Sequence, residues 1–285
     1  THEKVDSYIL LNIRGELTIS NDLIHVQDWL SDSTVYSSIP IGHIAVVDSY
    51  LAKKNDFKKI KKNASELIVI DDYNRMVFPE TNLIINPDIF GDKIDYSNQS
   101  ARVVGGKEYI IIRKEFYNYR NDFTVRKKIK KAGITVGGSD YQNLLPLFCN
   151  HLINSEQFKE IILFAGNENT RQKLSKKIND PAVKIFGYLS ADKMAQHFLE
   201  TDLVISASGQ TLNELAFLGI PTIGFCLDHD QRYNMEGYIL EGFLPYKLFW
   251  DQPDLLQSID DLIKIYANIN VRQDYNRIGQ VLVNG

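Results

Sequence analysis

Short apolar runs alternate with segments of helical periodicity along most of the chain. Before residue 124, the runs predict strands at Ser7–Ile13, Ile44–Asp48, Leu67–Ile70, Asn82–Ile85 and Tyr109–Ile112. After a basic stretch the pattern resumes, and it predicts strands at Ile134–Val136, Glu160–Ala165, Val183–Phe186, Leu203–Ser206 and Thr222–Phe225. Strands separated by helices at this spacing are typical of βαβ units, so both halves are predicted to form parallel sheets.

Helical periodicity fills the gaps between the strands and continues beyond them. Residues 140–153 and 192–200 are predicted to be helices, and residues 254–269 one amphipathic helix near the end of the chain. The strands "IILF" and "LVIS" are almost continuously apolar. Such strands are typical of a parallel sheet that is covered on both faces.

The joint between the two series of strands divides the chain. We expect ligand to bind at the carboxyl ends of the strands, in the cleft between two domains, because open parallel sheets hold their ligands there. The predicted fold is α/β, with Rossmann-like domains at residues 1–124 and 125–245 and a helical tail at residues 246–285.

The composition and the net charge limit the classes of binding partner that we expect for the protein. The chain has 285 residues, of which 44% are hydrophobic and 24% charged, as in ordinary soluble proteins. A net charge of -4 argues against a nucleic acid or an anionic membrane as partner, although backbone amides could still bind a small anion. Cys149 and Cys226 lie in or beside apolar runs and show no metal-binding spacing. We expect a cytoplasmic monomer without a membrane span, metal site or cofactor.

Glycines follow the first strand of the second series, in "VGGSD" (Val136–Asp140). Glycines allow a backbone to approach a ligand closely, and a helix N-terminus offers free amides to a phosphate. The alternative is a tight turn in which Ser139 or Asp140 caps the next helix. The local pattern favours neither interpretation.

A second group of small residues, Ser206 to Gly209, ends the strand "LVIS". Such residues leave room for a ligand over the strand end. Thr211 and Glu214 are three apart and would share a helix face. Glu214 could accept hydrogen bonds from both hydroxyls of a ribose, since a carboxylate is an acceptor only. The same Thr-x-x-Glu spacing also fits a capping box, and the spacing alone leaves both open.

Polar residues follow other strands as well. Asp48 and Tyr50 come directly after a strand of the first series, and Gln231 and Asn234 follow the last strand of the second. Each of these segments could equally be a rim or a solvated loop. The histidines and cysteines suggest no Ser/His/Asp or Cys/His arrangement.

The motifs together are more specific than any one of them. "VGGSD", "ISASGQTLNELAFLGIPTIGF" and "DQ" resemble the C-terminal domain of the GT-B nucleotide-sugar enzymes of the MurG-like superfamily. Within them they resemble most the PseG/SpsG group, which releases UDP from a UDP-diacetamido-trideoxyhexose in pseudaminic acid biosynthesis. "VVDSY", "VIDD", "LIINPDIFG" and "YIIIRKEFY" resemble further segments of that group in the same order, so the resemblance covers residues 44–242.

The resemblance implies a role for each matching residue. Glu214 would hold the ribose, and the helix that begins near Gly209 would face the diphosphate. Tyr50 and Gln231 would lie at the catalytic, sugar side, with Asp48 and Asp230 also binding the sugar. The UDP-binding residues would be Gly137, Gly138, Ser139, Asp140, Asn143, Ser208, Gly209, Thr211 and Glu214.

Three departures from the group's pattern bear on the reaction. Ser49 stands where the group has His, and Asp230 where it has Asn. The group's opening Gly-x-Gly-His loop, whose His is its proposed base, has no counterpart in this sequence. We therefore expect an incomplete first domain, UDP binding, and weak or no sugar-nucleotide hydrolysis. The alternatives are a GT-B glycosyltransferase that uses a UDP-sugar and a catalytically incomplete UDP-sugar-binding module.

Overall fold

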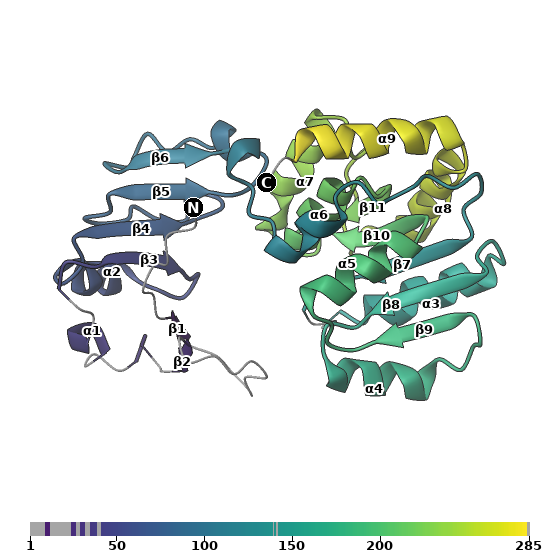
Figure 1. Cartoon of the computed structure of the whole chain (residues 1–285), viewed down its shortest axis with the longest axis horizontal. Coiled ribbons are helices and arrows are strands. Elements are labelled where there is room, and N and C mark those ends of the chain that lie inside the picture. The colour runs from purple at the N-terminus through teal and green to yellow at the C-terminus, as the bar shows by residue number, and fades with distance from the viewer. Residues whose placement is uncertain are drawn as a thin grey trace. The chain divides into compact units, whose positions relative to one another are not determined.

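The computed structural model describes residues 9–11, 24–26, 29–31, 35–38, 41–138, 140 and 142–283. The chain forms two compact units (Figure 1). The first unit comprises residues 1–86 and 94–104, and the second comprises residues 87–93 and 105–285. Within the described residues, no helix combines the length and the apolar character needed to cross a membrane.

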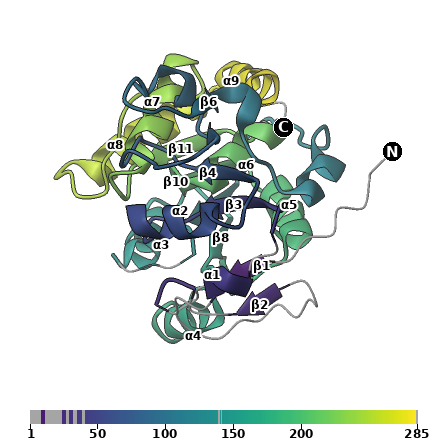
Figure 2. The ribbon, with the colours of Figure 1, turned by 90° about the vertical axis from the view of Figure 1, so that its left-hand side faces the viewer.

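The first unit contains a sheet of strand order β3-β4-β5-β6. The β3–β4 and β4–β5 pairs are parallel. Helix α2 (Lys54–Lys61) lies beside β3 and β4 (Figure 2). It buries Phe57 and Ile60 in a core that it shares with Leu67 and Val69. The strands are β3 (Ile44–Asp48), β4 (Glu66–Ile70), β5 (Leu83–Asn86) and β6 (Arg102–Gly105), and the unit also contains the parallel pair β1 (Ile9–Leu11) and β2 (Ile24–Val26) and the short helix α1 (Val35–Ser38).

The second unit is built on a five-stranded parallel sheet of order β11-β10-β7-β8-β9. Its strands are β7 (Lys131–Thr135), β8 (Glu160–Phe164), β9 (Val183–Phe186), β10 (Leu203–Ala207) and β11 (Thr222–Phe225). Its helices are α3 (Leu144–Asn154), α4 (Glu168–Lys177), α5 (Ala191–Glu200), α6 (Gln210–Leu218), α7 (Gln231–Leu240), α8 (Leu255–Tyr266) and α9 (Ile269–Leu282).

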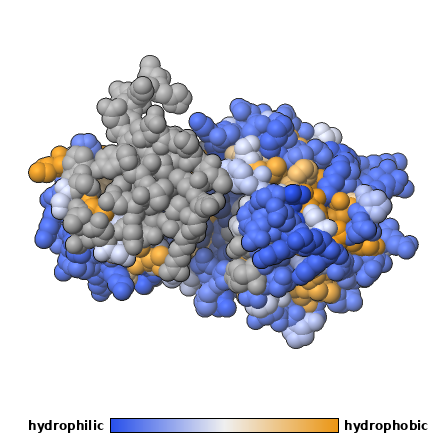
Figure 3. Space-filling view, turned by 90° about the horizontal axis from the view of Figure 1, so that it is seen from below, coloured by the Kyte–Doolittle hydropathy of each residue, from blue (hydrophilic) through white to orange (hydrophobic). Residues whose placement is uncertain are grey.

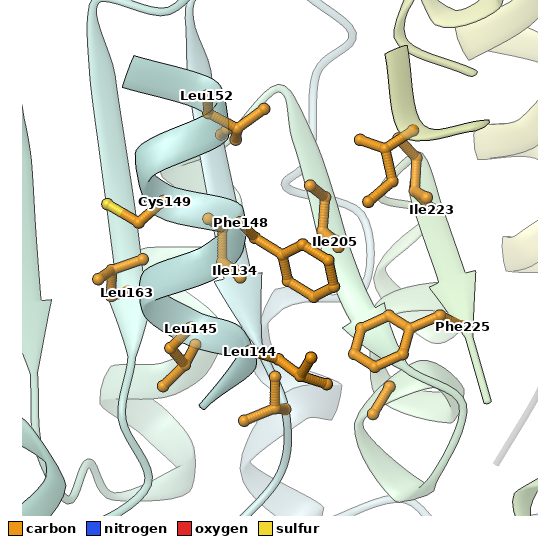
Figure 4. Packing of buried hydrophobic residues seen from close by; sticks show 14 of the residues in the cluster. Ile134, Leu144, Leu145, Phe148, Cys149, Leu152, Leu163, Ile205, Ile223 and Phe225 are labelled. Atoms are coloured by element: carbon orange, nitrogen blue, oxygen red, sulfur yellow. The ribbon is translucent and has the colours of Figure 1, made fainter. Parts of the chain in front are cut away.

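Hydrophobic cores lie on both faces of this sheet. Alternate strand residues point to opposite faces, so Ile161 and Leu163 pack with α3 and α8, whereas Ile162 and Phe164 pack with α5 and α6. Figure 4 shows the ring of Phe148 on α3 next to the ring of Phe225 on β11, against which it packs. Strands β8 and β10 are therefore buried on both sides, as their sequences predict. The lower face of the unit is mostly hydrophilic, with separate hydrophobic patches (Figure 3).

The structure divides the chain at different points from those predicted. Residues 105–124 belong to the second unit because Ile110, Phe116 and Phe123 are buried in its core. Residues 246–285 are also part of that unit rather than a separate tail. They contain the helix predicted at residues 254–269, which is α8, and a further helix, α9, which the sequence analysis did not predict.

The predicted strand at Tyr109–Ile112 is wrong. Strand β6, which the sequence analysis missed, ends at Gly105, and Gly106 then turns the chain with φ of 93°. A short 3-10 helix (Lys107–Tyr109) follows, so the apolar run lies beyond the sheet. Its Ile110 and Ile112 are buried in the second unit without belonging to a strand. The predicted strand Ser7–Ile13 is a strand at Ile9–Leu11, and its other residues lie outside the described ranges.

Candidate functional site

Strands β7 and β10 are neighbours at the centre of the second sheet. They run parallel, with Thr135 opposite Ser206. After β7 the chain continues to β8 on one side, whereas β10 and β11 lie on the other side. This arrangement is a topological switch point, where open α/β sheets bind ligands beyond the carboxyl ends of their strands. Both glycine-containing loops found in the sequence leave the sheet at this point.

The loop after β7 is open at its glycines and capped at its end. Gly137 has φ of 90°, and a Cβ added to Gly138 would meet no atom within 4 Å. The Asp140 carboxylate accepts hydrogen bonds from the amides of Leu144 (2.7 Å) and Leu145 (3.2 Å). Burial raises the pKa of Asp140, and these two hydrogen bonds oppose the rise. Asp140 therefore satisfies amides at the start of α3, although the N-cap of that helix is Asn143 and not Asp140.

Asn143 and Ser139 also belong to this loop. Asn143 adopts a left-handed conformation, with φ of 54°, immediately before α3. Ser139 lies outside the described residues. The amides of Leu144 and Leu145 are bonded to Asp140. A phosphate requires free amides, so another element at the switch point would have to supply them.

The sequence analysis missed Gly166 and Asn167, which follow β8 and support this loop. The Asn167 side chain donates to the Gly138 carbonyl (3.1 Å) and accepts from the Thr170 amide (2.8 Å). Gly166 has φ of 75°, and a Cβ there would lie 2.7 Å from the Gly137 carbonyl oxygen. The glycine is therefore required for the two loops to approach each other. In the sequence, only the position of Gly166 directly after a predicted strand pointed to this role.

We expect Gly166→Ala to lower the free energy of unfolding by about 1–3 kcal/mol and to weaken ligand binding at the loop. The added Cβ would be strained by the positive φ and would collide with backbone. Chemical denaturation of the purified variant measures the first effect. Gly138→Ala is the stability control, because a Cβ there has open space. Equal stability of the two variants would contradict the proposed loop contact.

The loop after β10 leads to a helix without a side-chain cap. Gly209 is the N-cap of α6, and this cap makes no side-chain hydrogen bond. The capping box is therefore not formed, because Thr211 lies inside the helix and Glu214 in its second turn. Ser208 is fully buried, and its Oγ has no hydrogen-bond partner. A helix N-terminus with uncapped amides and a buried hydroxyl beside it can bind an anion.

The Glu214 carboxylate is paired with Arg113. The guanidinium Nε lies 2.6 Å from Oε1, and Nη2 lies 2.8 Å from Oε2. The Glu214 side chain is 1% exposed, whereas that of Arg113 is 41% exposed. Burial raises the pKa of Glu214, and the hydrogen bonds and charge of Arg113 oppose this rise. Arg113 belongs to the segment "YIIIRKEFY" and is 101 residues from Glu214 along the chain, so nothing in the sequence indicated the contact.

Helix α7 contributes a buried polar network under the same loop. The Asn234 amide donates to the Ser208 carbonyl (3.0 Å) and to Asn213 Oδ1 (3.3 Å), and the Tyr238 hydroxyl also donates to Asn213 Oδ1 (2.9 Å). The Oδ1 of Asn234 is buried without a partner. An unsatisfied buried oxygen is costly and is often satisfied by a ligand or water.

The residues at the start of α7 face the same strand end. Gln231 Nε2 lies 3.5 Å from the position of a Cβ on Gly209, and its Oε1 accepts from the Leu227 amide (3.1 Å). Asp230 Oδ1 is buried without a partner. Burial and the nearby charge of Asp228 raise the pKa of Asp230. Gln231 is therefore next to Gly209, as a shared site requires.

Asp48 and Tyr50 belong to the first unit, at the carboxyl end of β3. The Tyr50 hydroxyl donates to Asp72, and its ring stacks on Tyr73. Arg75 was missed by the sequence analysis. It donates to the carbonyls of Ser49 (2.7 Å) and Ala52 (3.1 Å) and thereby holds the loop that carries Tyr50. Among the described residues, no group of three or more His, Cys, Asp or Glu is arranged to hold a metal ion.

Comparison with known protein families matches part of the second unit. Residues 133–237 match the model of the glycosyltransferase family 28 C-terminal domain. This range contains the end of β7, all of β10 and α6, and both loops of the candidate site. The match therefore includes the switch point and Glu214.

Two curated proteins are similar in sequence. An uncharacterized protein of Methanocaldococcus jannaschii is 26% identical over 210 residues, which is 69% of this chain and 43% of that protein. The spore coat polysaccharide biosynthesis protein SpsG of Bacillus subtilis is 25% identical over 176 residues, which is 58% of this chain and 50% of SpsG. The chain thus spans about half the length of these relatives.

Solved structures are similar in fold. An S. aureus MnaA–UDP complex has a TM-score of 0.59 and 11% identity, covering 92% of this chain and 79% of MnaA. MurG of Acinetobacter baumannii has a TM-score of 0.53 and 14% identity, covering 81% of this chain and 73% of MurG. The chain therefore has an α/β fold with two Rossmann-like units, as in the MurG-like GT-B enzymes, and its second unit is similar to the glycosyltransferase family 28 C-terminal domain.

Proposed function

We propose that the chain binds the UDP moiety of a sugar nucleotide at the switch point of the second unit and contributes to hydrolysis of the sugar–diphosphate bond. The observation that carries this proposal is the N-terminus of α6. It has no side-chain cap, the buried Ser208 Oγ beside it is unsatisfied, and an acidic side chain follows in its second turn. These groups complement a diphosphate followed by a ribose.

Different residues would contact the diphosphate, the ribose and the sugar of the proposed ligand. Amides of Gly209 to Thr211 and the Ser208 hydroxyl would bind the diphosphate, and Glu214 would accept the ribose hydroxyls. The rest of the nucleotide would lie against the open loop at Gly137 and Gly138. Asp140 and Asn143 would form the end of this loop. Gln231 and Asp230 would lie toward the sugar.

In the proposed reaction, a water oxygen forms a bond to the anomeric carbon of the sugar. The bond between that carbon and the β-phosphate oxygen breaks, and UDP leaves with the electron pair. The water proton passes to a general base, for which we assign no residue. The amides and the positive end of the α6 dipole stabilise the charge that develops on the leaving diphosphate.

Similarity to SpsG supports a nucleotide sugar of polysaccharide biosynthesis as the substrate class. We extend this to a UDP-diacetamido-trideoxyhexose in nonulosonic (pseudaminic) acid biosynthesis, on the resemblance of "VVDSY", "VIDD" and "DQ". A glycosyltransferase is the second candidate, because the matched family model is that of a glycosyltransferase domain.

Binding and turnover can be tested separately. We expect calorimetry to show UDP binding by the purified chain, with weaker binding of inorganic phosphate. Absence of UDP binding would refute both candidates. Incubation with UDP-diacetamido-trideoxyhexose, followed by chromatography of the products, distinguishes them. Free sugar and UDP without an acceptor support the hydrolase, whereas UDP release only on addition of a sugar acceptor supports the transferase.

A further inference from the structure

The carboxylate of Glu214 is held by a guanidinium through two separate hydrogen bonds, one to each oxygen. Arg113 Nε contacts Oε1 at 2.6 Å and Nη2 contacts Oε2 at 2.8 Å. This is the planar, bidentate geometry in which arginine fixes both the position and the rotation of a carboxylate. Arg113 is in turn held by Met194 Sδ at 3.4 Å from Nη2 and by the ring of Phe116, 5.0 Å from the guanidinium carbon.

The pairing leaves acceptor capacity on both oxygens. An ionised carboxylate offers about four lone-pair directions, and the two bonds from Arg113 use one on each oxygen. One further hydrogen bond to each oxygen is therefore possible. Two hydroxyls on adjacent carbons, as in ribose, can supply one donor to each of these positions.

The pairing also favours the charged form of Glu214. Its side chain is almost completely buried, and burial raises its pKa. Arg113 opposes that rise, whereas the nearby Glu115 adds to it. Tyr188 and Glu115 are the other titratable groups that act on Arg113. Without the guanidinium, the buried carboxyl would take up a proton more readily and would lose an acceptor position.

We propose that Arg113 is a positioning residue for ribose recognition: it favours the ionised form of the Glu214 carboxylate and holds it turned so that its free lone pairs face the two ribose hydroxyls. This rests on the proposed function, in which Glu214 binds the ribose of UDP. Arg113 acts through Glu214 and contacts neither the sugar nor the reacting atoms.

The experiment compares the affinities of UDP and 2′,3′-dideoxy-UDP at several pH values. The ratio of the two dissociation constants isolates the ribose hydroxyls, because the phosphates of both ligands titrate alike. We expect the wild-type ratio to be at least tenfold and to depend less on pH than in a variant without the guanidinium, because Arg113 opposes the rise in the pKa of Glu214. Isothermal titration calorimetry measures both constants.

The variants Arg113→Gln and Arg113→Lys separate charge from geometry. In Arg113→Gln the ratio should fall below about threefold at neutral pH and recover as the pH rises, because the carboxyl then ionises. In Arg113→Lys it should fall by a similar factor without changing with pH. Lysine keeps the charge but lacks the bidentate fork. If Arg113→Gln does not fold, the lysine variant still tests the geometry.

A matched control lies at the opposite end of β10. Arg126 pairs with Asp202 at 3.0 Å, with a 46% exposed guanidinium side chain and a 2% exposed carboxylate side chain. Arg126→Gln removes a comparable pair and should lower stability while leaving the ribose ratio unchanged. A fall of the ratio in this variant would show that the effect of Arg113 is merely structural, and it would overturn the inference.

The remaining outcomes distinguish the inference from the proposed function. If wild type binds UDP and dideoxy-UDP equally, the ribose contact of Glu214 is refuted and the role of Arg113 with it. If wild type discriminates and both Arg113 variants keep the wild-type ratio at every pH, the inference alone is overturned and the proposed function stands.

Discussion

Glu214→Gln is expected to lower the affinity for UDP by roughly 10- to 100-fold. A hydrogen bond to a charged acceptor contributes about 1.5–3 kcal/mol, and a glutamine amide offers a donor where one ribose hydroxyl requires an acceptor. The amide would also face Arg113 with an N–H group in place of the second oxygen that now lies 2.8 Å away. Calorimetric titration of the variant with UDP measures the loss.

The control is Glu236→Gln on α7. Glu236 lies in the same unit and also carries a salt bridge, to Lys247, but it is more exposed than Glu214. We expect this variant to bind UDP as wild type does. Thermal unfolding of Glu214→Gln must show a folded protein before its affinity is interpreted. A folded Glu214→Gln variant with wild-type UDP affinity would remove Glu214 from the proposed site.

Much of the fold follows from the sequence because buried parallel strands are short, continuous apolar runs. The predicted strand Ile44–Asp48 is confirmed in full, and Val183–Phe186 likewise. The apolar run at Tyr109–Ile112 was wrongly predicted to be a strand. Its hydrophobicity indicates that its residues are buried, and burial does not require pairing in a sheet. Gly106 had already turned the chain out of the sheet, and a single glycine does not reveal its φ in the sequence.

The site was less predictable than the strands. The order of the loops after β7 and β10 indicated where a ligand would bind, because strand ends are local features. The partner of Glu214 was not predictable in this way, since Arg113 is 101 residues away along the chain. The spacing of Thr211 and Glu214 also suggested a capping box. That interpretation is wrong because the helix begins at Gln210, which places Glu214 beyond its first turn.

Arg272→Ala is expected to lower the free energy of unfolding of the second unit by about 3–5 kcal/mol. The Arg272 side chain is fully buried and donates to the carbonyls of Tyr266 (2.8 Å), Arg126 (2.7 Å) and Lys127 (3.2 Å). It thereby ties α9 to the end of α8 and to the segment that precedes β7. Alanine would leave a cavity and three carbonyls without their donor, and each buried unsatisfied group is costly.

Urea unfolding followed by the fluorescence of Trp250 measures this effect, because that tryptophan packs against the core of the second unit, whereas Trp29 lies in the first. Arg272→Lys should recover only part of the stability, because one ammonium group cannot reproduce the spread of the guanidinium donors. Arg277→Ala, on the same helix, is the matched control. Its side chain is 73% exposed, so we expect a change within about 0.5 kcal/mol. Equal stabilities of Arg272→Ala and Arg277→Ala would show that α9 is held by its apolar contacts alone.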